Sequence, residues 1–84
     1  MDMSDIASRL FTKFGGGSRP DLRRALYEEL EEMVYNGGTN AERIYQVIAS
    51  VAADAIGKDK PGNYFAHVVK MRLKECKLLQ MAEL

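Results

Sequence analysis

The sequence is poor in the residues that most often build a chemical site. It contains one cysteine, one histidine and no tryptophan in 84 residues. The lone Cys76 cannot form an internal disulfide, and the Cys and His spacing of a four-ligand zinc site is absent. These absences are typical of a protein in a reducing compartment, so we expect a cytoplasmic protein without a metal or other cofactor.

An excess of charge of one sign and long apolar runs are also missing. Lys and Arg number 12, and Asp and Glu number 12, so the formal net charge is zero. The charge of the whole chain therefore attracts neither nucleic acid nor an anionic membrane. No apolar run approaches the roughly 18 residues of a membrane span. The opening MDMSDIASRL has no apolar region of the kind a signal peptide needs, so we expect neither a membrane anchor nor a signal peptide.

Helical periodicity is present along most of the chain. Apolar residues recur every three or four positions, which predicts helices near residues 4–14, 19–36, 40–56 and 61–81. No alternating strand pattern occurs, so we expect an all-α fold, a small bundle of four helices in one domain of residues 1–84. The predicted core consists of Leu26, Leu30, Ile44, Ile48, Val51, Phe65 and Val69.

Several residues mark the expected helix ends. Ser18 is a candidate N-cap for the second helix, and Pro20 suits its first turn. Thr39 and Glu42 have the spacing of a capping box at the start of the third helix. Gly57 is a candidate for the end of that helix.

Residues 15–18, GGGS, divide the N-terminal segment 1–14 from the helical core 19–84. They are expected to act as a glycine hinge, although their composition is also that of an engineered linker joining a peptide to a three-helix domain. In either case Ile6, Leu10 and Phe14 need a surface to pack on. That surface is predicted to be this bundle or the bundle of another copy.

The fourth predicted helix concentrates basic charge. Residues 58–77 carry six Lys or Arg and two acidic residues, whereas residues 21–36 carry two basic and five acidic residues. Its basic stripe lies opposite its apolar side, and is read either as a contact for phosphate or an acidic partner, or as an ordinary solvated face. The candidate contact residues are Lys58, Lys60, His67, Lys70, Lys74 and Lys77.

Two polar residues fall on the apolar side of the same helix. Arg72 is expected to form an ion pair with Glu28, Glu29 or Glu32, or else to contact a ligand. Cys76 is expected to be buried as a small apolar side chain.

We expect that the protein is not an enzyme. The acidic run EELEE is more typical of an exposed helix than of a catalytic pair, and GGGS lacks the Lys-Ser/Thr of a phosphate-binding loop. No small-molecule substrate is indicated.

The stretch KPGNYFAHVVKMRLKE resembles a segment near the ends of helical modules in plasmid and phage DNA replication proteins. In those modules a Pro-x-x-Tyr-Phe turn opens a terminal helix with a basic, amphipathic continuation. The resemblance implies an accessory or terminal module that acts beside DNA replication machinery. The matching residues are Pro61, Tyr64, Phe65, Val69, Lys70 and Arg72.

Two functions remain open. The first is a protein-interaction module, including a homodimer, because several aromatic residues are expected to be exposed and such rings are enriched at interfaces. The second is a nucleic-acid-binding module that uses the basic face of the last helix. We favour the first because the local basic charge is moderate. Its predicted interaction residues are Ile6, Leu10, Phe11, Phe14, Tyr27, Tyr35, Tyr45 and Arg72, with Phe11 and the three tyrosines as the exposed rings.

Overall fold

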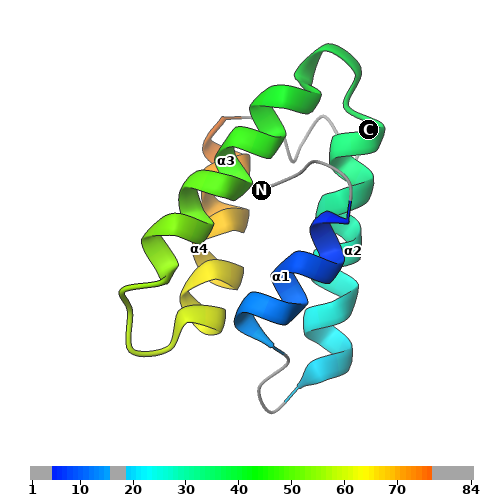
Figure 1. The fold of residues 1–84 in the computed structure, drawn as a ribbon. Coiled ribbons are helices and arrows are strands. Elements are labelled where there is room, and N and C mark those ends of the chain that lie inside the picture. Colours follow the sequence, from blue (N-terminus) through cyan, green and yellow to red (C-terminus); the bar gives the residue numbers. More distant parts are fainter. Residues whose placement is uncertain (1–4, 16–18, 77–84) are drawn as a thin grey trace.

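The computed structural model describes residues 5–15 and 19–76, which form a small bundle of four α-helices (Figure 1). No strand occurs in this part of the chain, so the all-α prediction is confirmed. None of its helices has the length and apolar content that a membrane crossing requires. The elements are α1 (Ile6–Phe14), α2 (Pro20–Tyr35), the short 3-10 turn η1 (Gly38–Asn40), α3 (Ala41–Ala55) and α4 (Pro61–Glu75).

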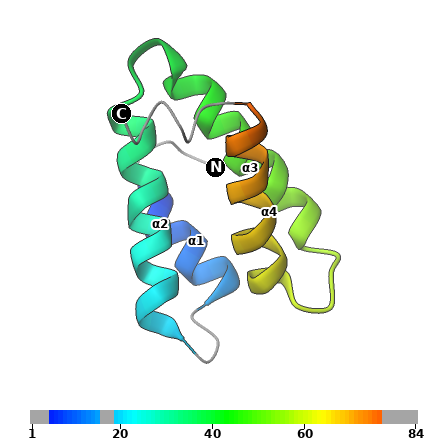
Figure 2. The ribbon, with the colours of Figure 1, turned by 180° about the vertical axis from the view of Figure 1, so that it is seen from behind.

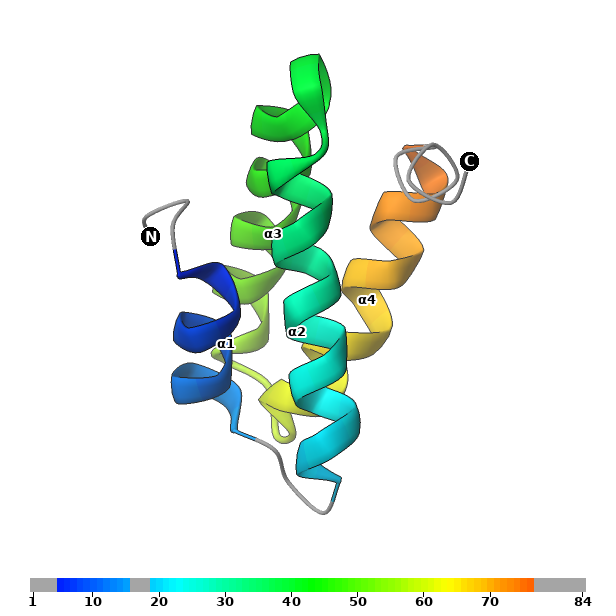
Figure 3. The same cartoon turned by 90° about the vertical axis from the view of Figure 1, so that its right-hand side faces the viewer.

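Successive helices run in opposite directions, so α2 and α4 run parallel to each other (Figure 3). Helix α2 packs on both α1 and α3, and α3 packs on α4. In Figure 2, α2 and α4 lie side by side in the near layer, with α1 and α3 behind them. This arrangement places the first turns of α2 and α4 at the same end of the bundle.

The buried core draws on all four helices. Every residue of the predicted core is buried except Leu26, which is partly buried and packs against the others. Helix α1 contributes Ile6 and Leu10, which have no exposed surface. The apolar side of α1 therefore packs on the bundle of its own chain. A nine-residue helix is marginal in isolation, so this burial is what stabilises α1.

An aromatic cluster joins α1, α2 and α4 at the centre of the core. The Tyr27 ring lies edge-on to Phe11, with 6.3 Å between centroids, and edge-on to Phe65 at 5.9 Å. Phe14 stacks on Phe65 at 4.9 Å. The prediction that Tyr27 is exposed is wrong, since its side chain is fully buried. Tyr27 lies one helical turn before Leu30 and so shares the inward face of α2.

The predicted capping box does not form. Thr39 lies inside η1, and the N-cap of α3 is Asn40, which makes no side-chain capping bond. Asn40 already has right-handed helical angles, so the chain passes directly from the 3-10 turn into α3 without the extended N-cap that a capping box needs. Gly57 follows the C-cap residue Ile56, close to the predicted end, whereas Ser18 lies outside the described residues.

Candidate interaction groove between α2 and α4

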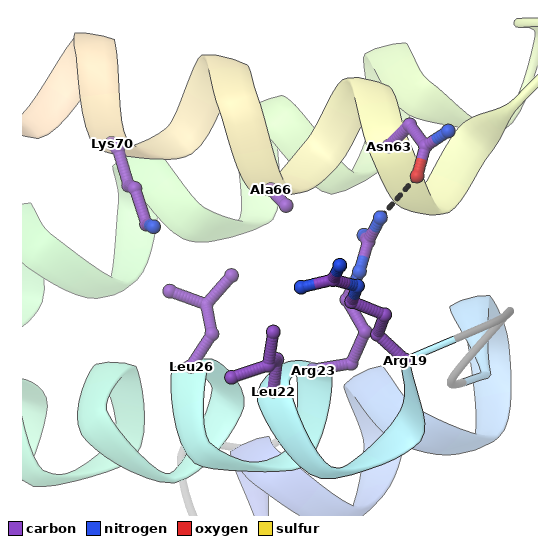
Figure 4. Close-up of a pocket in the computed structure, with 7 residues that line it drawn as sticks. All are labelled: Arg19, Leu22, Arg23, Leu26, Asn63, Ala66 and Lys70. Carbon is purple, nitrogen blue, oxygen red and sulfur yellow. Dashed lines mark hydrogen bonds between the residues drawn. The ribbon is translucent and has the colours of Figure 1, made fainter.

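A groove runs between α2 and α4 on the surface of the bundle (Figure 4). It has a volume of about 350 Å³. Ala66, on the α4 side, contributes only a methyl group, so side chains leave the space between the two helices unfilled. The lining residues are Arg19, Leu22, Arg23, Leu26, Asn63, Ala66 and Lys70.

The middle of the groove is apolar. Leu22 is 59% exposed, and Leu26 and Ala66 are partly buried beside it. A single exposed leucine on a protein surface needs no explanation. Here, however, three apolar side chains from two helices line the same groove, and they are called the apolar strip below. Burial of such a strip by a partner would be favourable.

Cationic side chains flank this apolar strip. Arg19 and Arg23 lie near the first turn of α2, and Lys70 projects from α4 further along the groove (Figure 4). None of the residues that line the groove is acidic. The first turns of α2 and α4 lie at the Arg19 end, and the positive ends of their dipoles point the same way. The groove is therefore suited to a partner that is both apolar and negatively charged.

Arg23 differs from the other two cations because its guanidinium is already engaged. Its Nη1 donates to the carbonyl oxygen of Gly62. Its Nη2 donates to Oδ1 of Asn63, as Figure 4 shows. These bonds join the starts of α2 and α4. A Cβ on Gly62 would lie 3.4 Å from Nη1 of Arg23 and 3.3 Å from the carbonyl oxygen of Phe14, so glycine permits this close packing.

The residues of the predicted basic stripe lie at different places on the surface, and Lys70 is the one that lines the groove. Lys70 lines the groove, whereas His67 and Lys74 are exposed on α4 without being part of its lining. The ammonium group of Lys58 lies over the Tyr64 ring, 5.0 Å from its centroid. Lys60 is the exposed N-cap of α4, and Lys77 lies outside the described residues.

Two expectations for the apolar side of α4 are wrong. Arg72 pairs with Asp54 of α3, at 4.0 Å between Nη2 and Oδ2, and not with a glutamate of α2. The reason is that Arg72 lies on the edge of α4 that faces α3. Cys76 is exposed rather than buried, because α4 ends at Glu75 and Cys76 belongs to the following turn, although the helix was expected to reach residue 81.

The predicted interaction residues are dispersed. Ile6 and Leu10 belong to the core, while Phe11, Phe14 and Tyr45 are partly buried against it. The Arg24 guanidinium covers the Phe11 ring at 4.6 Å from its centroid. Of the predicted aromatic residues, Tyr35 is the one with a largely exposed ring, at 63%.

Arg19, Leu22 and Arg23 were not among the predicted site residues. Arg19 is the N-cap of α2, and Leu22 and Arg23 follow it by three and four residues on the edge of the helix that lines the groove. That edge was recognisable in the sequence as a mixed row of arginines and leucines. The sequence does not show that α4 runs parallel to α2 beside this edge. Helix α4 forms the second wall of the groove.

None of the residues that line the groove is a His, Cys, Asp or Glu, the side chains that most often hold a metal ion. Across the described ranges, no three such side chains gather where they could hold a metal ion. Comparison of the chain with protein-family models, with curated proteins and with solved structures gives no match in any of the three. The geometry of the chain itself is therefore the basis for a functional proposal.

Proposed function

We propose that this protein is a non-enzymatic interaction module that binds an acidic amphipathic helix of a protein partner in the groove between α2 and α4. The observation that carries the proposal is the composition of the groove: an apolar strip of Leu22, Leu26 and Ala66, three cations and no acidic side chain. A partner helix with leucines on one face and glutamates beside them would match both features.

A helix suits the groove better than a small molecule does. Small-molecule sites bury most of the ligand surface in a concave, mostly apolar pocket. Here Leu22 is 59% exposed, so the groove is open to solvent along the two helices. Such a surface supports a row of side chains at spacings of three and four residues, as an α-helix presents them.

We further propose that this module acts in the cytoplasm beside DNA replication machinery. The support for this setting is the resemblance of Pro61–Glu75 to helical modules of plasmid and phage replication proteins. In that setting, the partner helix belongs to another protein of the machinery or to a second copy of this one.

Nucleic-acid binding is the alternative function. It is favoured by His67, Lys70 and Lys74, which are all exposed on α4. Phosphate contacts by these side chains would give an affinity that falls steeply with salt concentration. The groove favours a protein partner more strongly because nucleic acid would make no use of its leucines.

A peptide titration tests the proposal. A synthetic helical peptide with leucines on one face and flanking glutamates would be titrated with the protein, with fluorescence anisotropy as the readout. We expect binding to weaken about tenfold in Arg19→Glu, where an attractive charge becomes repulsive. Lys74→Glu is the matched control, since it makes the same charge change on α4 outside the groove, and its affinity should equal that of the wild type.

Three results would contradict the proposal. The first is equal affinity for the acidic peptide and for a version with lysines in place of the glutamates. The second is equal loss of affinity in Arg19→Glu and Lys74→Glu. The third is salt-sensitive binding of a short DNA duplex that Lys74→Glu weakens while the acidic peptide does not bind, which would favour the nucleic-acid alternative.

A further inference from the structure

A graded row of side chains begins at the N-cap of α2 and continues along the helix, and its first two members, Arg19 and Leu22, line the groove. The row, called the α2 stripe below, follows helical spacings of three and four residues. It begins with a cation, continues with two apolar residues and ends with two carboxylates. All five side chains are exposed. The α2 stripe consists of Arg19, Leu22, Ala25, Glu29 and Glu32.

The charged side chains of the α2 stripe have no partners in the described part of the chain. Arg23 donates to Gly62 and Asn63, but no ion pair or hydrogen bond with a side-chain atom of Arg19, Glu29 or Glu32 occurs there. The stripe therefore presents unpaired positive charge at one end and unpaired negative charge at the other. In an antiparallel copy of the same stripe, the cationic end at Arg19 meets the acidic end at Glu32.

We propose that the acidic helix in the groove is α2 of a second copy, so that two chains pair through their α2 stripes in antiparallel orientation. This inference rests on the proposed function and names its partner. The two chains are related by a two-fold axis that passes between Ala25 and Leu26, so residues at equal distances from the axis face each other. Arg19 therefore faces the partner's Glu32. By the same count, Leu22 lies beside the partner's Glu29, whose methylene groups cover the leucine while its carboxylate stays in water at the rim of the contact. Each contact occurs twice because the interface is isologous.

The antiparallel orientation follows from the charges. A parallel pair would place Arg19 beside the partner's Arg19 and the two carboxylate ends side by side, which is unfavourable. At the proposed axis, Ala25 is small enough to let the two helices approach closely. Leu22 and Leu26 then lose water on both copies, and the isologous contact closes without exposing a further binding surface.

A single pair of helices makes a small interface. Interfaces below about 1,200 Å² of buried area are typical of weak, reversible complexes. We therefore expect a dimer whose population depends on protein concentration. Because the paired charges are at the surface, salt should weaken the association.

Sedimentation equilibrium of the full chain at low salt, at concentrations up to about 1 mM, tests the pairing. The wild type should show a monomer–dimer equilibrium. Arg19→Glu and Glu32→Arg should each weaken it about tenfold, since both symmetric ion pairs become repulsive at once.

An equimolar mixture of the two variants should restore dimers, because in the heterodimer each pair again joins opposite charges. Lys74→Glu should associate like the wild type, and circular dichroism should show equal helix content in all four proteins.

The outcomes separate this inference from the proposed function. A wild type that stays monomeric, or a mixture of the two variants that does not restore dimers, overturns the antiparallel pairing. If such a protein still binds the acidic peptide with dependence on Arg19, the groove function stands and its partner is another protein. If neither the peptide nor a second copy binds, both proposals fall.

Discussion

The side chain of Glu31 on α2 accepts a hydrogen bond from the backbone N–H of Ala7 on α1, with 3.0 Å between Oε2 and the nitrogen. The first N–H groups of a helix have no partner within the helix. Asp5, which precedes α1, has a left-handed backbone with φ of 61° and makes no side-chain capping bond. Glu31 thus caps α1 from a neighbouring helix and ties the N-terminal segment to the bundle.

Replacement of Glu31 should loosen α1. In Glu31→Ala the N–H of Ala7 loses its charged acceptor, and we expect the free energy of unfolding to fall by about 1–2 kcal/mol. Urea unfolding monitored by circular dichroism measures this. Glu28→Ala is the matched control, because Glu28 is exposed on the same helix and its side chain makes no hydrogen bond among the described residues. Equal losses in the two variants would show that the capping bond does not stabilise the bundle.

Tyr27 predicts a dependence of stability on alkaline pH. Its hydroxyl is buried without a hydrogen-bond partner among the described residues. Burial raises the pKa of this hydroxyl above its ordinary value of 10.0, and the nearby Arg23 opposes part of the shift. The folded state therefore holds the proton more tightly than the unfolded state. Stability contributed by neutral Tyr27 is fully present below pH 10.0 and is lost as the pH rises through the folded-state pKa.

The variant Tyr27→Phe tests this interpretation. It removes an unpaired buried hydroxyl while keeping the ring between Phe11 and Phe65, so at neutral pH we expect stability to rise by up to about 1 kcal/mol. Melting temperatures measured from about pH 8 to about pH 11 should fall less steeply in Tyr27→Phe than in the wild type. Tyr35→Phe, at a ring that is 63% exposed, should keep the wild-type slope. Identical slopes in all three proteins would contradict the prediction.

Periodicity alone was sufficient to predict the helices and most of the core. Ile44, Ile48 and Val51 are buried as predicted, because a wide apolar stripe can face only inward in a bundle. The amphipathic ring of Tyr27 favours the surface, whereas its position relative to Leu30 places it inside, where the structure has it. For an amphipathic residue, position on the helix therefore decided burial.

The groove could not be predicted in the same way. Lys70 was identified as a contact residue from its place on α4, and the structure puts it in the groove lining. Its companions Arg19 and Leu22 come from α2, and only tertiary packing brings the two helices together. The pairing of Arg72 with Asp54 of α3 has the same origin, because sequence periodicity gives the face of a helix but not its neighbour.

Leucines of the core and of the groove should respond differently to truncation. Leu30 is 1% exposed, so Leu30→Ala should lower the free energy of unfolding by about 2–5 kcal/mol. Leu22 is 59% exposed, so Leu22→Ala should change it by less than about 0.5 kcal/mol while weakening the binding of the acidic peptide. Urea unfolding and the peptide titration give the two values. A large stability loss in Leu22→Ala would mean that this side chain belongs to the core.

The Arg23 guanidinium should determine how firmly α4 is held against α2. It donates to the Gly62 carbonyl and to Asn63 Oδ1 at once, which the single ammonium group of a lysine cannot do with the same planar geometry. In Arg23→Lys the positive charge stays but at least one of the two bonds is lost, so we expect a destabilisation of about 1 kcal/mol.

Asn63→Ala removes one acceptor and leaves the backbone bond, and its effect should be smaller than that of Arg23→Met, which removes both. Amide hydrogen exchange over the first turn of α4 should quicken in the same order, since that turn opens when the bonds to α2 are lost. If exchange there is as slow in Arg23→Met as in the wild type, contacts within the aromatic cluster, and not Arg23, fix the start of α4.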